Sequence, residues 1–147
     1  MIEIKEILLV EDSPYDAELT LEALSEINLA NRIEWIKDGA QALDYLHCRG
    51  DYAGRAPINP ALILLDLKLP KVDGRQVLQD IRNTPGLKTI PVVVLTSSRE
   101  QSDLLSCYSN GVNAYVVKPV VFADFMNAVK TLGLFWAAIN QPPPAGA

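Results

Sequence analysis

Cysteine, histidine and long apolar runs are all scarce in this sequence of 147 residues. Its two cysteines, Cys48 and Cys107, and its single histidine, His47, lack the spacing of a zinc site. We therefore expect free thiols in a reducing cytoplasm and an ordinary helical residue at His47. No apolar run is long enough to cross a bilayer, and no secretory signal pattern precedes the first strand pattern. These absences argue against a disulfide scaffold, a Cys/His metal centre and a membrane span.

Positive charge is scarce as well. The chain has 13 Lys and Arg against 18 Asp and Glu, which gives a net charge of -5 at pH 7. Because no basic cluster offsets this balance, we expect neither nucleic acid nor a membrane as a partner. The sequence also has no G-x-S-x-G motif, no P-loop and no second histidine for a catalytic triad.

The most informative stretch is the apolar run from Ala61 to Leu65, which ends at Asp66. A run without polar alternation is typical of a strand buried on both faces, as in a parallel sheet covered by helices. Five strand patterns of this general kind alternate with helical patterns. The strands are expected at 6–10, 32–36, 61–66, 91–96 and 113–118; the helices are expected from Pro14 onward, at 39–48, 75–83 and 100–110, and around Phe125, Val129 and Leu132.

This alternation predicts one α/β domain over residues 1–133. We expect a doubly wound, five-stranded parallel sheet in the order 2-1-3-4-5 with helices on both faces, the flavodoxin-like arrangement. Residues 134–147 are expected to form an apolar extension and a proline-rich tail, disordered at 141–144. At the first helix, Ser13 is expected to be the N-cap, with Asp16 completing a capping box. Asp73 is expected to cap the third helix.

Polar side chains follow the carboxyl ends of four of these strands. Glu11 and Asp12 follow the first strand, Asp66 the third, Thr96 the fourth and Lys118 the fifth. Parallel strands end at the same edge of a sheet, and the crevice at the switch point of the predicted order lies between strands one and three. We therefore expect the three carboxylates to lie side by side.

Three crowded carboxylates repel one another, by about 4 kcal/mol for a pair ~4 Å apart at an effective dielectric constant near 20. A Mg²⁺ ion would remove that penalty, since it binds carboxylate, water and phosphate oxygens. Lys118 supplies a positive charge and Thr96 a hydroxyl, which suit the oxygens of a transferring phosphoryl group. Asp66 is then the nucleophile and forms an aspartyl phosphate.

These motifs together resemble the receiver domain of response regulators in two-component signalling. The resemblance covers about residues 5–132 and rests on Glu11-Asp12, the stretch 66–74, Thr96-Ser97 and Lys118-Pro119. It implies a sensor histidine kinase as phosphodonor and Mg²⁺ as cofactor. It further implies a signalling protein that catalyses only its own phosphorylation and slow self-dephosphorylation.

The resemblance also implies roles for individual residues. Lys68 is expected to offer its backbone carbonyl to the metal, and the peptide bond before Pro119 is expected to be cis. Small Ser97 would leave the phosphoryl site open. Thr96 and Tyr115 are expected to form the switch, in which the hydroxyl moves toward the phosphoryl group while the aromatic ring turns inward.

Three further features resemble the stand-alone regulators paired with bacterial phytochromes: the opening 11–14, the long loop 50–60 before the Asp66 strand, and the stretch 132–136. The implied kinase is therefore a phytochrome. Too little chain follows Lys118 for a DNA-binding module, so we expect the output to be a contact with an unknown downstream protein.

The C-terminal extension has more large apolar residues than a solvated end requires. Either it packs on its own domain or it forms an interface, and we favour a homodimer. The expected interface residues are Tyr108, Tyr115, Phe122, Leu134, Phe135 and Trp136.

Three alternatives stay open at this point. A pseudo-receiver would bind partners without phosphorylation. An Asp-nucleophile phosphohydrolase typically has a second aspartate two residues after the nucleophile, where this chain has Lys68. A metal-dependent nuclease with an Asp-x-Asp pair is disfavoured by the same residue.

Overall fold

The computed structural model describes residues 5–29 and 32–144 of the chain. The predicted domain start at residue 1 and tail end at residue 147 lie outside the described residues. Five parallel strands form one sheet in the order β2-β1-β3-β4-β5, which confirms the predicted topology. The strands are β1 (Ile7–Val10), β2 (Ile33–Ile36), β3 (Leu62–Leu65), β4 (Val92–Thr96) and β5 (Ala114–Val117).

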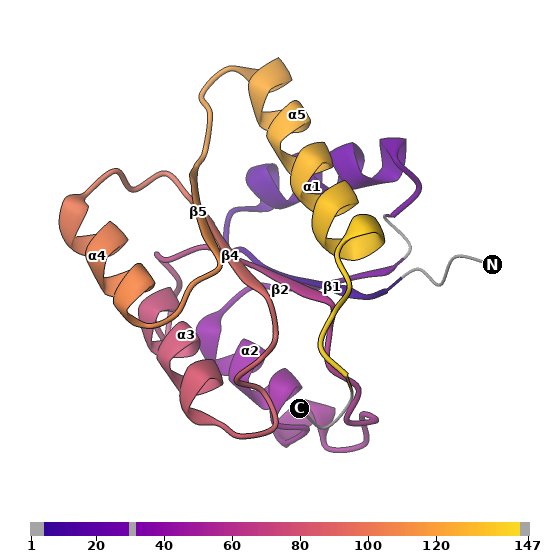
Figure 1. Ribbon diagram of the computed structural model, residues 1–147, viewed down its shortest axis with the longest axis vertical. Helices are drawn as coiled ribbons and strands as arrows, with labels where there is room; N and C mark the ends of the chain where they lie inside the picture. The colour runs from indigo at the N-terminus through magenta and orange to yellow at the C-terminus, as the bar shows by residue number, and fades with distance from the viewer. Residues whose placement is uncertain (1–4, 30–31, 145–147) are drawn as a thin grey trace.

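Helices cover both faces of this sheet, as Figure 1 shows. One face is covered by α1 and α5, and the other by α2, α3 and α4. The helices are α1 (Pro14–Glu26), α2 (Gly39–Leu46), α3 (Gly74–Asn83), α4 (Gln101–Ser109) and α5 (Phe122–Gly133), with a short 3-10 turn, η2 (Gly50–Tyr52), after α2. Within the part of the chain that the structure describes, no helix has the length and hydropathy needed to cross a lipid bilayer.

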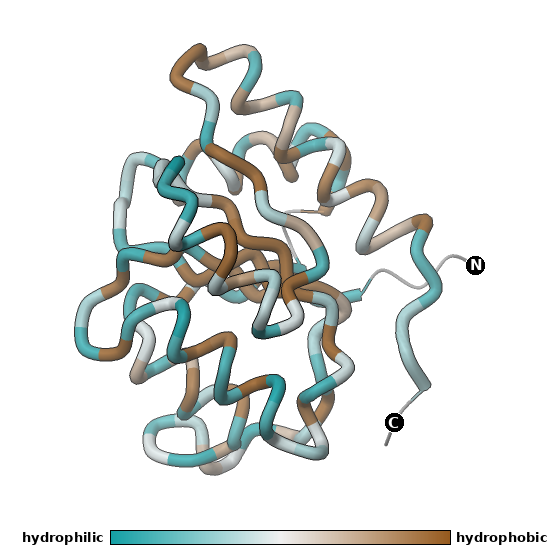
Figure 2. The backbone as a smooth tube through the Cα atoms, turned by 60° about the vertical axis from the view of Figure 1, so that its left-hand side comes forward, coloured by the Kyte–Doolittle hydropathy of each residue, from teal (hydrophilic) through white to brown (hydrophobic). Residues whose placement is uncertain are grey.

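The three central strands β1, β3 and β4 are built from buried aliphatic residues, with Thr96 at the end of β4, because helices exclude water from both faces. Alternate residues enter two separate cores: Leu8 and Ile63 face α2 and α3, whereas Leu9 and Leu64 face α1 and α5. In Figure 2 these strands form the brown centre of the molecule. A sheet packed on both sides holds its carboxyl edge in a fixed geometry, and the polar residues lie at that edge.

The C-terminal segment continues α5 without a break. A π-helical stretch, η3 (Leu134–Ile139), follows Gly133, and Ala137 within it is buried in the core that faces α1 and α5. Trp136 is partly buried against the same core. The segment therefore packs on its own domain along one side, which is one of the two possibilities considered for it.

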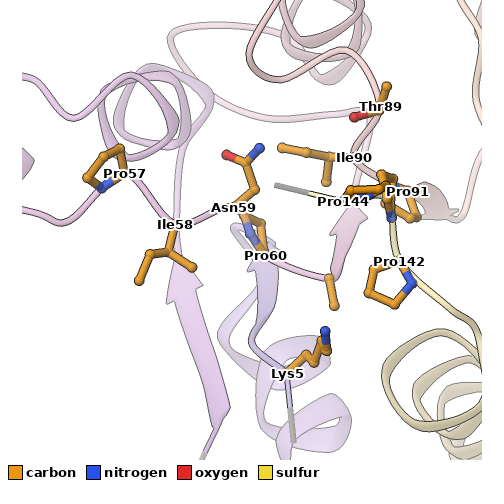
Figure 3. A pocket seen from close by; sticks show the side chains of 12 residues that line it. Lys5, Pro57, Ile58, Asn59, Pro60, Thr89, Ile90, Pro91, Pro142 and Pro144 are labelled. Carbon is orange, nitrogen blue, oxygen red and sulfur yellow. The ribbon is translucent and has the colours of Figure 1, made fainter. Parts of the chain in front are cut away.

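Beyond η3 the chain runs along the amino-terminal edge of the sheet. Pro142, Pro143 and Pro144 line a pocket with residues 57–61, which precede β3, and residues 89–91, which precede β4 (Figure 3). Residues 141–144 form no helix or strand, and their expected disorder stays a prediction. This pocket lies at the edge opposite to the polar residues.

Candidate functional site

The carboxyl ends of β1, β3 and β5 and the first turn of α1 bring one lysine and three carboxylates together. The Lys118 Nζ atom lies 2.5 Å from Glu11 Oε1, 2.9 Å from Asp66 Oδ2 and 2.8 Å from Asp16 Oδ2. The side chains of Lys118 and Asp66 are only 9% and 10% exposed. All three hydrogens of the ammonium group thus have a carboxylate acceptor in a largely water-free place.

Hydrogen bonds to the backbone of Lys118, Asp66 and Glu11 fix the strand ends that carry these side chains. The Lys118 N–H donates to the carbonyl of Thr96 at 2.7 Å, and the Asp66 N–H donates to the carbonyl of Val10 at 3.0 Å. The Trp35 indole Nε1 donates to the backbone carbonyl of Glu11 at 2.8 Å. Glu11, Asp66 and Lys118 are therefore each anchored to a neighbouring strand.

Asp16 was not predicted as a site residue. Ser13 caps α1 as expected, since its side chain accepts from the Asp16 N–H at 3.3 Å. The expected capping box is wrong, because the Ser13 N–H donates to Glu11 Oε2 and the Asp16 carboxylate turns to Lys118 instead. The available signal was an acidic residue one helical turn after Asp12, on the helix that leaves the site. A complete capping box does form at α3, where Asp73 is the N-cap as expected.

Three carboxylates form a group suited to a metal ion. One oxygen from each of Glu11, Asp12 and Asp66 lies within 4.8 Å of the others. An all-oxygen, acidic donor set is what a hard divalent cation prefers. Glu11 and Asp66 are buried while Asp12 is exposed, so water and phosphate oxygens can complete the coordination from the open side. The residues present therefore fit the expected Mg²⁺.

The charges at this site shift the protonation of two groups. Burial raises the pKa of Glu11 to about 7; the hydrogen bond from Lys118 opposes this rise, and the nearby charge of Asp66 adds to it. Burial alone would lower the pKa of Lys118, but the hydrogen bonds to Asp16 and Glu11 outweigh it and raise that pKa. The lysine is thus firmly cationic. Because burial destabilises the ionised form of Glu11, its carboxylate has a higher affinity for a proton or a metal ion.

The β4–α4 loop connects the two expected switch residues. Thr96 is fully buried, and its Oγ1 accepts from the Ser98 N–H at 3.3 Å. The Tyr115 hydroxyl donates to the Ser98 carbonyl at 3.0 Å, and its ring packs partly buried against the core on the α2–α4 side. The Ser98 hydroxyl donates to Asp103 Oδ2 at 2.6 Å, which ties the loop to α4. Thr96 and Tyr115 therefore meet through Ser98, and a shift of the loop would move both.

The structure also bears on four other expected features. Ser97 is exposed and lines a shallow hollow with Lys118 and Asp16. Lys68 is exposed in the loop after β3. The expected cis bond before Pro119 is wrong, because the described chain has no cis peptide bond and this one takes the trans form that X–Pro bonds intrinsically favour. Cys48 and Cys107 are free thiols, as expected.

The residues expected at a dimer interface fall into two groups. Tyr108, Phe122, Leu134 and Phe135 are about half exposed. Tyr115 and Trp136 are partly buried against their own domain. The first group is thus available to a partner, whereas Trp136 already has an intramolecular role.

The fold and the site together define a doubly wound α/β protein with an acidic, metal-competent site and a buried lysine at the carboxyl edge of its sheet. The family model for the response regulator receiver domain matches residues 7–130, which is most of the chain. The chain therefore belongs to the response regulator receiver family.

Two curated relatives are similar along nearly their whole length. The probable methanogenesis regulatory protein FilR2 of Methanothrix harundinacea is 44% identical over 137 residues, which cover 93% of this chain and 86% of FilR2. The response regulator Rcp1 of Synechocystis sp. is 42% identical over 141 residues, which cover 96% of this chain and 95% of Rcp1.

Solved structures of response regulators, two of which are named for phytochromes, are similar as well. The phosphorylated cyanobacterial phytochrome response regulator RcpA has a TM-score of 0.90 at 39% identity and matches 97% of this chain and all of its own. The Mn²⁺-bound form of Rcp1 has a TM-score of 0.88 at 40% identity, with 95% and 99% covered. The bacteriophytochrome response regulator RtBRR is 56% identical with a TM-score of 0.76, with 98% and 87% covered.

Proposed function

We propose that this protein accepts a phosphoryl group on Asp66 from a sensor histidine kinase, with Mg²⁺ as cofactor. The observation that carries the proposal is the contact between Lys118 Nζ and Asp66 Oδ2, at 2.9 Å, beside a group of three carboxylates that fits a divalent cation. A carboxylate held by a fixed cation and flanked by metal ligands is arranged to attack a phosphorus atom.

In the proposed reaction an Asp66 carboxylate oxygen attacks the phosphorus of a phosphohistidine. The O–P bond forms while the P–N bond breaks, and the electron pair of that bond goes to the imidazole. Glu11, Asp12, Asp66 and the Lys68 carbonyl would hold the Mg²⁺, which supplies positive charge to the phosphoryl oxygens when bound. Lys118 and the Thr96 hydroxyl would donate to those oxygens, and the small exposed Ser97 leaves room for them.

The proposed output is a shape change in the β4–α4 loop. When Thr96 Oγ1 turns to a phosphoryl oxygen, it gives up its contact with the Ser98 N–H. The loop and the Tyr115 ring, which is tied to the Ser98 carbonyl, would then move together. The surface that changes would bind a downstream protein, so phosphorylation acts as a switch and the protein is not an enzyme with a separate substrate.

The proposed kinase is a bacterial phytochrome. RcpA and RtBRR are phytochrome response regulators, and their similarity to this chain supports a phytochrome as its kinase. FilR2, which is similar as well, is named as a methanogenesis regulator.

We further propose a homodimer through the exposed residues around Phe122 and Leu134. The proposed location is the cytoplasm, where the free thiols stay reduced.

Intact-protein mass spectrometry tests the central claim. The protein is incubated with acetyl phosphate, with and without Mg²⁺, beside Asp66→Asn. We expect a single phosphoryl adduct that requires Mg²⁺ and is absent from the variant. Asp73→Asn is the matched control, because this capping aspartate lies at the start of α3 outside the metal-binding group, and it should keep the adduct. No adduct under any condition would favour the pseudo-receiver alternative.

A further inference from the structure

We propose that Asp16 is a positioning residue that takes up part of the hydrogen bonding of the Lys118 ammonium group and so limits its competition with Mg²⁺ for the oxygens of Glu11 and Asp66. The inference rests on the proposed metal site and goes beyond it. Its basis is that Lys118 Nζ has three carboxylate partners, of which only Asp16 lies outside the group of carboxylates that fits a metal.

Asp16 matters because it is the third acceptor of the Lys118 ammonium group. A lysine ammonium has three hydrogens, and here they face Glu11, Asp16 and Asp66 at 2.5–2.9 Å. If Asp16 were absent, the charge of Lys118 would be shared by Glu11 and Asp66 alone. Those two side chains are also the buried members of the metal-binding group, so the ammonium would compete more strongly with a cation for their oxygens.

The local structure of α1 holds Asp16 in this role. Its N–H donates to the Ser13 side chain, and its carbonyl accepts from the Thr20 hydroxyl at 2.8 Å, so the first turn of the helix is fixed on both sides. Ser13 in turn donates its N–H to Glu11 Oε2. Because the capping box is not closed by Asp16, its carboxylate is free to reach across to β5.

A double-mutant cycle on the metal affinity of the unphosphorylated protein tests the inference. Mg²⁺ binding is measured by isothermal titration calorimetry and by the NMR signal of the Trp35 indole N–H, which donates to the Glu11 carbonyl. We expect Asp16→Asn to weaken Mg²⁺ binding about tenfold, the low end of the cost of changing a group outside the direct metal ligands. In the Lys118→Met background the same substitution should have little effect, because Asp16 then has no ammonium to hold.

Glu18→Gln is the matched control, because it removes one negative charge from an exposed position of the same helix. It should change the affinity less than twofold (roughly the limit expected for a screened surface charge). Lys118→Gln provides a second neutral background if Lys118→Met does not fold.

The outcomes separate this inference from the proposed function. An equal loss of affinity in both backgrounds would show that Asp16 acts only through its charge, and no loss in the wild-type background would remove its role entirely. If the wild-type protein bound no Mg²⁺, the metal site itself would be overturned along with the inference. A phosphoryl adduct on Asp66 that survives Asp16→Asn with unchanged Mg²⁺ affinity would leave the proposed function intact and reject only the role of Asp16.

Discussion

Glu11 couples the protonation of the site to the stability of the fold. Burial raises its pKa from 4.5 to about 7, so the folded state binds this proton more tightly than the unfolded chain does. Stability from this group is fully present below the unfolded pKa and is lost as the pH rises from 4.5 to 7. At 1.36 kcal/mol per pKa unit, the loss is of the order of 3 kcal/mol.

We therefore expect the metal-free protein to lose more stability than Glu11→Gln between about pH 5 and about pH 8, measured by urea unfolding. Adding Mg²⁺ at the higher pH should restore stability to the wild type, because the ion binds only the folded state. If the unfolding free energies of the wild type and Glu11→Gln changed with pH in parallel, this account would be wrong.

Tyr115 offers a second test at the residue scale. Its hydroxyl donates to the Ser98 carbonyl, so Tyr115→Phe should release the β4–α4 loop while keeping the ring in place. We expect a loss of about 0.5–1.5 kcal/mol and faster hydrogen exchange at the Ser98 and Glu100 amides. Tyr108→Phe is the control, since that tyrosine is 54% exposed on α4. Unchanged exchange in Tyr115→Phe would mean that the loop is held without the tyrosine.

At the scale of elements, the loop between β3 and α3 depends on one glycine. A Cβ atom on Gly74 would lie 2.2 Å from the carbonyl oxygen of Asp66 and 2.6 Å from the Cα of Leu67. Both neighbours are backbone atoms beside the proposed phosphoryl acceptor, so the loop would have to shift. Gly74→Ala should cost about 1–3 kcal/mol in unfolding free energy despite the better helix propensity of alanine, and should also weaken Mg²⁺ binding.

Gly86→Ala is the control for that substitution, because a Cβ at Gly86 meets nothing within 4 Å. Its thermal unfolding should stay close to that of the wild type. If Gly74→Ala unfolded at the same temperature as Gly86→Ala and bound Mg²⁺ equally well, the close contact between residue 74 and the Asp66 carbonyl would contribute nothing to stability or to metal binding.

The elements of this fold could be predicted because each depends on a local pattern. The buried run before Asp66 and the Ser13 cap both act within a few residues, and the structure has them where expected. Asp16 could not be predicted in the same way. Its partner Lys118 is 102 positions away, and the Ser13 N–H that a capping box would give to Asp16 goes to Glu11 instead.

The tail illustrates the same limit. Its apolar composition predicts contact with something, but composition alone cannot tell an intramolecular contact from an interface. The structure divides the segment: Gly133 lies against Leu24 and Ala137 is buried, whereas Leu134 is 48% exposed. Deleting everything after Leu132, which would be the simplest test of a dimer, would therefore also remove part of the core.

At the scale of the whole molecule, point substitutions test the proposed dimer better than truncation. Phe122 and Leu134 are 54% and 48% exposed, so replacing both with serine removes apolar surface without opening the core. We expect Phe122→Ser with Leu134→Ser to weaken dimerisation at least about tenfold, equivalent to 1.4 kcal/mol, in analytical ultracentrifugation over a concentration series. Ile58→Ser is the matched control, because Ile58 is 74% exposed beside the pocket at the opposite edge of the sheet and should leave the association unchanged. If the wild type is monomeric throughout the series, or if the double variant associates as tightly as the wild type, these side chains do not form a dimer interface.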